Sequence, residues 1–591
     1  MPTFTWRHNG PVWKSNVGLG YSRGRMNDDN EGYFKSTPIA RSGVTVSFGN
    51  ITELRPGAIA VTDGTTGAPV DPYDINSYIV RSALFQPRRA VNLRSSATAD
   101  LSREFMIRVP VTIKGGLGIS RELRDNPGSG TTSYNYVGRD GRGNPTIFTP
   151  VGTDDTAAPY LDQTFSRPRL PFGFPSVQVL SDSRAYDALR ATPSYFVLDE
   201  NNQYRLDVTS SKRAEEIISF GYLRGDLALL DRRLKLVGGL RAEQTNIDAE
   251  GPLTDLTRNF QRDASGRIIR GPNGVPLPIT TYALETSKLT LIARGQKVDK
   301  EYLRLFPSIN ASYNVRDNLV ARAAYFYSIG RPDFNQYSGG LTLPNTDTPA
   351  SAGGLIVVNN AAIKAWQADT FRAQCEYYFE GVGMVSLGGF RREFENFFGG
   401  TTFAATPDFL EIYGLDPLVY GPYPVSTQVN VTGKVRMTGL EFTYKQALTF
   451  LPFWARGVQV FANATAQRAT GPEIANLSGY VPRTANWGVS LTRERFSARM
   501  NWNYRGRARR TLVTGVGIEG GTFQWSAERL QLDAQVDARI TKKLSLFANF
   551  RNLNDAPIEV QTAGPSTPDY ARITTRTLVG SLWTFGVRGS F

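Results

Sequence analysis

The feature that most constrains this chain is a period of two that runs through long segments. One parity of residues 530–540 is apolar and begins with Leu530, Leu532 and Ala534, while the other parity is polar. The same pattern resumes in residues 544–552, after a short polar turn. Successive side chains of a β-strand point to opposite faces, so the two segments predict a hairpin of long strands.

Strand length separates two classes of sheet. Strands of globular proteins cluster near five or six residues, whereas about nine to eleven tilted residues cross the hydrocarbon core of a bilayer. Apolar-out, polar-in alternation is typical of a water-filled membrane barrel. The hairpin alone fits either class, but residues 435–447, 458–467 and 496–505 repeat its pattern, with Phe461 and Phe547 as large apolar exceptions at polar positions. The pattern predicts an all-β fold, a transmembrane antiparallel β-barrel.

Composition excludes several alternatives. No change of composition divides the 591 residues, and no apolar run reaches the eighteen residues that a transmembrane helix needs. The chain has one cysteine, Cys375, and one histidine, His8, which leaves no disulfide framework and no clustered metal site. Cys375 shares the parity of apolar residues and is expected to face lipid. We predict no metal and no cofactor.

The net charge of +14 raises the question of a nucleic-acid partner. The basic residues are mostly arginines, and they recur singly in loops and at inward strand positions such as Arg499, Arg505 and Arg551 rather than in one patch or helix. We therefore predict no nucleic-acid binding. The charge is either ordinary solvated charge of lumen and loops or a lumen whose field favours anions.

Short and long connections alternate along the chain, which is typical of the periplasmic turns and extracellular loops of a barrel. This alternation gives about 19 strands. Bacterial single-chain barrels have even counts, so the odd number indicates a miscount or a missing part. The strands are expected at residues 2–7, 12–22, 42–50, 55–62, 93–103, 107–122, 217–228, 234–245, 301–313, 319–328, 370–378, 384–394, 435–447, 458–467, 484–493, 496–505, 530–540, 544–552 and 580–591.

Several segments together resemble the barrel of TonB-dependent outer-membrane receptors. They include AYFYSIGRPDFNQYSGGLTLPNTD (324–347), GKVRMTGLEFTYKQALTFLP (433–452), ITKKLSLFANFRNLNDAPIEV (540–560) and the closing SLWTFGVRGSF. By this resemblance, residues 1–591 form one receptor-like barrel. The match is best over residues 217–591 and weaker over the residues before them. Residues 359–369 depart from the family's proline-containing pattern.

The resemblance implies a barrel of the 22-stranded receptor type. Family members begin with a signal peptide, a TonB box and a plug domain, and none of these is seen before the first expected strand here. If the first strand takes the place of strand four, the 19 expected strands are strands 4 to 22. We therefore expect a truncated receptor that lacks the plug and three strands. The terminal Phe591 resembles the signal that the barrel assembly machinery recognises.

The function that the resemblance implies is uptake of a scarce ligand, such as a siderophore or carbohydrate, across the outer membrane of a Gram-negative-type bacterium. TonB with ExbB and ExbD would supply the energy through the plug, and outer-membrane lipid would surround the barrel. A passive porin-like diffusion channel is the alternative. We do not expect an enzyme, because His8 is remote from any serine and aspartate that could form a nucleophile with its base.

Ligand contacts are expected in the loops and the upper lumen, because aromatic side chains stack on ring systems and arginine binds carboxylates. Packing within the loops or a place in the interfacial girdle is the other interpretation of the same residues. The candidates are Arg331, Asp333, Phe334, Tyr337, Trp366, Tyr413, Tyr420 and Tyr423. Trp487, Trp502 and Trp583 are expected in the aromatic girdle at the membrane interface.

Overall fold

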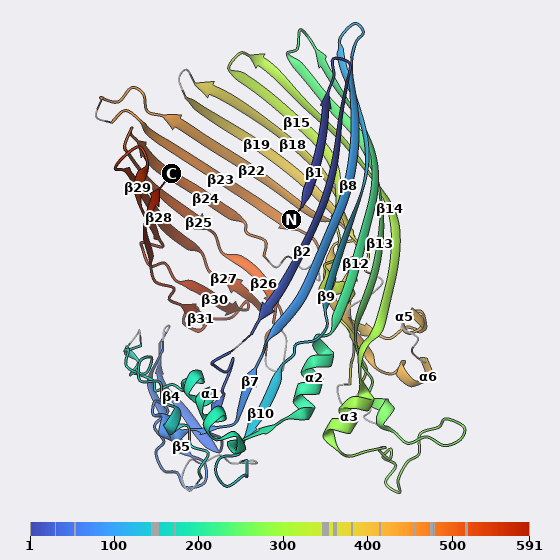
Figure 1. The fold of residues 1–591 in the computed structure, drawn as a ribbon, viewed down its shortest axis with the longest axis vertical. Helices are drawn as coiled ribbons and strands as arrows, with labels where there is room; N and C mark the ends of the chain where they lie inside the picture. Colours follow the sequence, from blue (N-terminus) through green and yellow to red (C-terminus); the bar gives the residue numbers. More distant parts are fainter. Residues whose placement is uncertain are drawn as a thin grey trace.

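The computed structural model describes residues 2–29, 31–52, 55–143, 153–170, 173–344, 354–358, 363–379, 382–412, 415, 417–453, 455–472, 477, 479–513 and 518–589. Nearly half of these residues belong to the strands of one large curved sheet (Figure 1). Short turns lie at one end of the sheet, and long connections with helices lie at the other.

The large sheet has 21 strands, of which four short ones lie in the long connections: β16 (Leu341–Thr342), β17 (Ile356–Val358), β20 (Phe398–Ala404) and β21 (Pro424–Asn430). The other seventeen follow one another, each antiparallel to the next. In order they are β1 (Thr3–Asn9), β2 (Trp13–Asp28), β8 (Arg88–Met106), β9 (Pro110–Asn126), β12 (Lys212–Leu229), β13 (Leu234–Thr254), β14 (Leu291–Arg316), β15 (Leu319–Gly330), β18 (Trp366–Phe379), β19 (Gly383–Glu395), β22 (Val435–Ala447), β23 (Val458–Thr470), β24 (Arg483–Thr492), β25 (Phe496–Arg505), β28 (Arg529–Arg539), β29 (Leu544–Arg551) and β32 (Leu582–Gly589).

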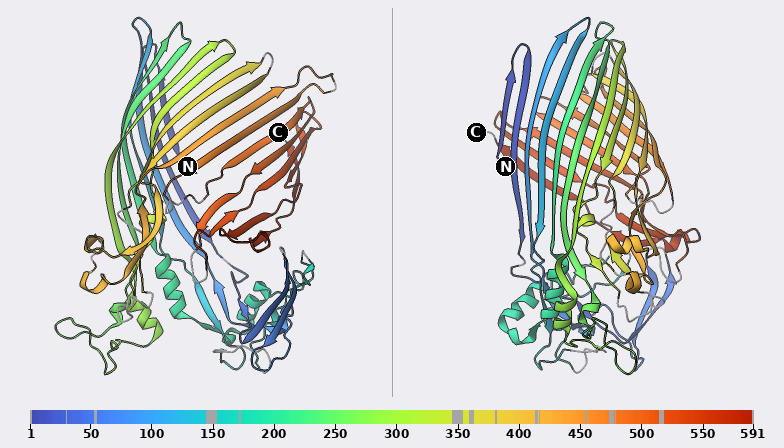
Figure 2. Two further views of the ribbon diagram at one scale, coloured as in Figure 1. Left: turned by 180° about the vertical axis from the view of Figure 1, so that it is seen from behind. Right: turned by 90° about the vertical axis from the view of Figure 1, so that its right-hand side faces the viewer.

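The period of two sorts side chains onto the two faces of this wall. Leu440 and Phe585, on the convex face, are 62% and 65% exposed. Other large apolar residues at the same parity are also exposed. The exposed Cys375 pairs with Leu387 on this face. Within the described residues no ladder joins β1 to β32, and the wall is open between them (Figure 2).

Two of the nineteen expected strands lie outside the large sheet, so it holds seventeen of them. Residues 42–50 and 55–62 are strands, β4 (Val44–Ile51) and β5 (Pro56–Asp63), but they pair only with each other. Alternation of apolar and polar residues predicts a strand but does not specify the strand with which it pairs. Because a short turn joins β4 to β5, each is the nearest available partner of the other. The expectation that the barrel begins at strand four rested on that count and loses this support.

Several strands are longer than expected at the loop end. The segment expected at 301–313 is part of β14, which spans 26 residues, and 234–245 is part of the 21-residue β13. In these extensions the outward positions carry charged residues such as Asp248, Glu250 and Lys297. The apolar residues there, such as Ile247 and Val298, change to the inward face, so a pattern with apolar residues at one continuing parity ends before the strand does.

The large apolar residues on the polar face lie over glycines of a neighbouring strand. A Cβ atom on Gly488 would lie 2.7 Å from the Phe461 ring, and one on Gly586 would meet Phe547. Phe220 covers Gly118 in the same way. An aromatic ring that packs over a glycine fills the space of the missing side chain and fixes the register of the two strands.

The connections after β2 and β9 fold together into a small domain, here named the cap (described residues of 31–87 and 127–211; Figures 1 and 2). Its buried core includes Phe34, Ile75, Tyr136, Tyr160 and Phe196. The elements around this core are β3 (Ile39–Ala40), η1 (Ile75–Ser77), β6 (Ile79–Val80), β7 (Ser82–Phe85), β10 (Thr132–Tyr136), η2 (Ala158–Tyr160), α1 (Asp182–Ala191), η4 (Pro193–Tyr195), β11 (Phe196–Leu198) and α2 (Glu200–Ser210).

The remaining connections carry short elements. These are η5 (Leu256–Asn259), α3 (Ala283–Thr290), α4 (Phe334–Tyr337), α5 (Pro407–Ile412), α6 (Pro417–Tyr420), β26 (Ala508–Leu512), β27 (Phe523–Ser526), β30 (Ile558–Ala563), η7 (Asp569–Ala571) and β31 (Ile573–Thr577). No helix in the described part of the chain is long and apolar enough to cross a bilayer.

Candidate functional site

The inner face of β22 to β32 forms a polar hollow of about 1030 Å³. Most of the side chains that line it point away from the apolar face, because successive residues of a strand point to opposite faces. Most of them are amides, hydroxyls or cationic groups. The polar lining residues are Thr443, Lys445, Gln459, Asn463, Asn486, Ser490, Arg499, Asn501, Asp533, Gln535, Asn549, Arg551 and Thr584.

A ladder of amide side chains runs across the hollow from β24 to β28. Asn486 donates to Asn501 at 3.2 Å, Asn501 donates to Asn503 at 3.3 Å, and Asn503 donates to Asp533 at 3.2 Å. Asp533 also accepts from Gln531 at 2.8 Å. Donors and acceptors of this kind can replace water around a polar solute.

The lining of the hollow carries three cations, Lys445, Arg499 and Arg551, and one carboxylate, Asp533. Within the described residues, the structure gives no ion pair for Lys445, Arg499 or Arg551. Asp533 is the carboxylate among the lining residues, and it is already engaged by amides. Clefts lined by one sign of charge concentrate ions of the opposite sign, so the hollow favours an anionic solute.

The first group of expected ligand residues packs against the extended strands β12 to β14. Arg331 donates to Glu243 at 2.6 Å and to Thr245 at 3.2 Å. Tyr337 is 2% exposed within an apolar cluster, and Phe334 packs against the same cluster. Asp333 caps α4 by accepting from the backbone N–H of Gln336. The structure therefore brings these four residues together at a site where they hold a loop onto the wall.

The other expected ligand residues belong to different clusters. Tyr420 and Tyr423 are buried in an apolar core with residues of β16, β17 and β21. Trp366 packs on Phe394 and Phe397, with ring centroids 5.2 Å and 6.4 Å apart. Tyr413 lies outside the described residues. Contact of any of these residues with a ligand remains a prediction.

Burial also affects the chemistry of these tyrosines. Burial raises the pKa of the Tyr337 and Tyr420 phenols above the ordinary value of tyrosine. Both phenols are therefore neutral at physiological pH. Without movement of their loops they offer a ligand little surface.

The three girdle tryptophans lie on the outward face. Trp487 and Trp502 are directly paired across β24 and β25, and their rings stack at 6.4 Å with an interplanar angle of 3°. Trp583 is exposed and contacts Phe550 at 5.6 Å. Their place in an interfacial girdle remains a prediction, as does the role of Phe591, which lies outside the described residues.

Comparison with known protein families shows the family to which this chain belongs. The model of the family described as TonB dependent receptor-like, beta-barrel matches residues 5–553. The chain belongs to this family. A search of curated protein sequences gives no significant match.

Solved structures similar to this receptor barrel show the same fold at low identity. The ferric-catecholate import receptor Fiu from E. coli K12 has a TM-score of 0.52 and 14% identity, with 99% of this chain and 63% of that chain covered. The ferripyoverdine receptor of the Pseudomonas aeruginosa outer membrane, bound to ferripyoverdine, has a TM-score of 0.50 and 13% identity, with 100% and 56% covered. The FpvAI–pyocin S2 complex has a TM-score of 0.51 and 12% identity, with 100% and 56% covered. The chain thus spans less than two thirds of these structures.

Sequence reasoning did not find the asparagines that hold the receptor's last long loop. Asn552 has φ of +56°, is 5% exposed and donates to the carbonyl of Gly580 at 2.9 Å. Asn554 accepts from the backbone N–H of Leu532 at 2.9 Å and donates to the carbonyl of Leu530 at 2.7 Å. The signal was present in the sequence as NLND, because asparagine tolerates a left-handed backbone and bonds to nearby backbone groups.

Proposed function

We propose that this receptor barrel takes part in the energised import of a scarce anionic ligand, with a ferric siderophore as the favoured class. The observation that carries the proposal is the hollow on the inner face of β22 to β32, where Lys445, Arg499 and Arg551 form no ion pair with any described residue. An anionic chelate would lose water on entering this hollow and would regain hydrogen bonds from the amide ladder and the arginines.

Family membership supports the transport class, and two of the similar structures are described as receptors for iron chelates, ferric-catecholate and ferripyoverdine. The energy would come from TonB with ExbB and ExbD acting through a plug domain, as is usual in the family. A carbohydrate ligand would accept hydrogen bonds from the amides and the cations of the hollow but, being neutral, would gain no charge–charge attraction.

The test measures uptake by cells that express the receptor from its complete chromosomal reading frame. A ⁵⁵Fe-loaded catecholate siderophore and a neutral radiolabelled oligosaccharide are supplied in parallel, with and without a protonophore. We expect saturable uptake of the iron chelate that stops when the protonophore dissipates the proton gradient.

Two results would contradict the proposal in different ways. Saturable uptake of the oligosaccharide alone would overturn the anionic ligand class. Uptake that rises linearly with concentration and ignores the protonophore would show a passive channel.

A further inference from the structure

The short turns of the wall differ in charge along its length. The five short turns between β1 and β19 contain three cations and three carboxylates in all, and the next three contain five cations and one carboxylate. The five balanced turns are residues 10–12, 107–109, 230–233, 317–318 and 380–382. The three basic turns, here named the basic rim, are residues 448–457, 493–495 and 540–543. Because short turns of outer-membrane barrels lie on the periplasmic side, the excess positive charge faces the periplasm.

The three turns of the basic rim are tied into one continuous edge. Arg493 in the second turn donates to the carbonyl of Phe453 in the first at 3.0 Å. Arg539, at the end of β28 and beside the third turn, donates to the carbonyl of Glu494 in the second at 2.6 Å. These hydrogen bonds fix the three turns relative to one another.

Most cations of the basic rim are exposed and lack a carboxylate. Within the part of the chain that the structure describes, no ion pair is formed by Arg456, Arg495, Lys542 or Lys543. Glu494, the one carboxylate of the rim, lies 3.8 Å from Arg539. A surface that carries one sign of charge concentrates ions of the opposite sign. The rim therefore favours an anionic partner.

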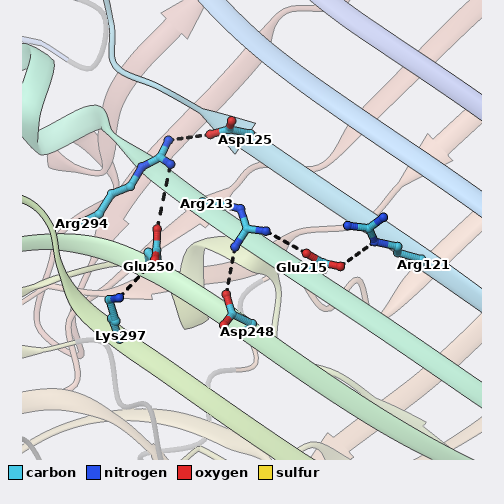
Figure 3. Close-up of polar contacts among 8 residues, drawn as sticks. All are labelled: Arg121, Asp125, Arg213, Glu215, Asp248, Glu250, Arg294 and Lys297. Carbon is cyan, nitrogen blue, oxygen red and sulfur yellow. Dashed lines mark hydrogen bonds and ion pairs between the residues drawn. The ribbon is translucent and has the colours of Figure 1, made fainter.

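Dense charge elsewhere on the wall is balanced by the protein itself, as Figure 3 shows. Arg213 bonds to Glu215 at 2.8 Å and to Asp248 at 3.0 Å. Arg294 lies 2.5 Å from Asp125. These residues lie on β9 and β12 to β14 at the long-loop end, where each cation in the figure has a carboxylate of the same chain. The basic rim has no such internal balance.

The first turn of the basic rim exposes two aromatic rings. Phe450 is 73% exposed and Phe453 is 77% exposed. Their turn joins β22 to β23 and projects beyond the ends of these strands (Figures 1 and 2). Contact of such rings with water is unfavourable, so a partner that covers them gains free energy. The flat apolar face of a sugar ring matches an aromatic ring in size and shape.

We propose that the basic rim binds peptidoglycan, the sugar polymer of the cell wall whose stem peptides carry free carboxylates. Sugar rings pack on Phe450 and Phe453, and the carboxylates bind the unpaired cations. Successive turns of the rim are two strands apart, or about 10 Å. A polymer that repeats its sugars and carboxylates along its length can contact all three turns at once, so that several weak contacts act together.

A folded protein partner fits this edge less well. A stable protein interface buries about 800 Å² on each side around an apolar centre. The basic rim offers two rings on one turn and single cations on the other two. The inference goes beyond ligand import, since it depends on the periplasmic position of the short turns and not on what the receptor transports.

The binding test sediments the purified receptor with isolated peptidoglycan sacculi. The receptor is held in nonionic detergent, the sacculi have been freed of protein, and the bound fraction is measured against sacculus concentration. Sacculi whose carboxyls have been converted to methylamides are the comparison. We expect binding to be roughly tenfold weaker on the neutral sacculi, because the cations lose their counter-charges. Binding to native sacculi should also weaken at about 0.5 M salt, where charges are screened.

The contribution of charge is tested by K542Q/K543Q. This variant removes two exposed cations of the basic rim and should weaken binding by roughly threefold to tenfold. Its matched control is R108Q/R232Q, which removes two exposed cations from the balanced turns. The control should bind native sacculi as the unmodified receptor does.

The contribution of the rings is tested by F450A/F453A. This variant should weaken binding to native and to neutral sacculi by a similar factor, roughly tenfold, because stacking on a sugar does not depend on charge. Its matched control is I107A/V382A, which removes two apolar side chains from the balanced turns that are 77% and 60% exposed. The control should leave binding unchanged.

Four results would overturn the proposal. The first is equal binding to native and neutral sacculi. The second is undiminished binding by F450A/F453A or by K542Q/K543Q. The third is an effect of either control equal to that of its matched variant. The fourth is equally tight binding to beads coated with polyglutamate, which would show a site for any polyanion. A variant that loses the heat-dependent gel mobility of a folded barrel is replaced by the single substitution F453A or K543Q, for which the same criteria hold.

Discussion

The two halves of the inner wall differ in how closely their cations are paired. From β8 to β22, Lys114 bonds to Asp100 at 2.9 Å, and Arg322 donates to both oxygens of Glu376. From β22 to β32, Arg588 lies 3.7 Å from Asp537, but Lys445, Arg499 and Arg551, which line the hollow, have no ion pair in the described residues. The same strand alternation builds both halves. The difference teaches that a paired wall is fixed by its own side chains, whereas an unpaired wall is left to interact with a solute.

The largest effect that separates the halves is expected from loss of one cation. Arg331→Met leaves Glu216 without its ion-pair partner in a partly buried site and removes one of the two cations that Glu243 contacts, since Arg241 stays 2.6 Å from Glu243. Allowing for their partial exposure, we expect a loss of about 2–3 kcal/mol in the free energy of unfolding. Arg499→Met, in the unpaired half, should stay within about 0.5 kcal/mol. Thermal unfolding of both variants in detergent measures the difference.

A double variant makes that result specific. E216Q/R331M removes a carboxylate together with its cation and should recover part of the lost stability. If Arg499→Met proves as costly as Arg331→Met, the distinction between paired and unpaired halves is wrong.

The second prediction asks whether packing, unlike charge, is the same in both halves. A Cβ atom on Gly118 would lie 2.5 Å from the Phe220 ring, and one on Gly488 would lie 2.4 Å from the carbonyl of Met500. Gly118→Ala and Gly488→Ala should each cost about 1–3 kcal/mol, because a packed site must shift to admit a methyl group. Chemical unfolding followed by tryptophan fluorescence gives both values.

Gly225→Ala is the matched control, because a Cβ atom there meets nothing within 4 Å. Its cost should be below that of either packed glycine. A cost confined to one half would mean that the halves differ in packing as well as in charge.

The cap offers a third way to bury polar groups, namely as a neutral pair. The hydroxyls of Tyr136 and Tyr160 lie 2.9 Å apart, and burial raises the pKa of both phenols. In the unfolded cap both phenols would ionise near pH 10. The free energy of unfolding of the cap is therefore independent of these phenols' titration below pH 10 and falls as the pH rises above 10. The loss should approach 1.4 kcal/mol per pH unit for each tyrosine.

Limited proteolysis at pH 8 to 11.5, with phenolate absorbance as the second signal, measures this loss. Y136F/Y160F should flatten the dependence, whereas the amide ladder of the hollow gives none. Ionisation of both phenols in a protease-resistant cap would refute the burial argument.

How much of the fold could be predicted from the sequence depends on where apolar and polar residues alternate along the chain. It predicted β28 and β29 closely, because Leu530 and its successors separate apolar from polar positions. It stopped short on β13 and β14, where the apolar residues change to the inward face, as at Ile247, Ala249 and Val298. It could not specify that β4 and β5 pair apart from the wall, since pairing partners depend on contacts far away in the sequence.

The candidate site divides in the same way. The inward arginines Arg499 and Arg551 were identified from parity alone, and the structure places both in the hollow. Tyr337 and Tyr420 were selected by residue type within loops, and they are buried there. A loop has no period from which a side chain's direction can be inferred, so residue type alone cannot distinguish a binding aromatic from a packing one.

The smallest expected effect tests the unpaired half directly. K445Q/R499Q/R551Q removes three exposed or half-exposed cations, each worth a few tenths of a kcal/mol to an anion in water. The apparent KM for ⁵⁵Fe siderophore uptake should rise roughly threefold to tenfold, with little change in maximal rate. At about 0.5 M salt this difference should shrink, because the Debye length falls well below 10 Å. D100N/K114Q, a neutralised pair of the other half, should leave KM unchanged at both salt concentrations. Because D100N/K114Q leaves the net charge of the lumen unchanged, an equal rise in KM for the two variants would mean that the cations of the hollow have no special part in ligand recognition.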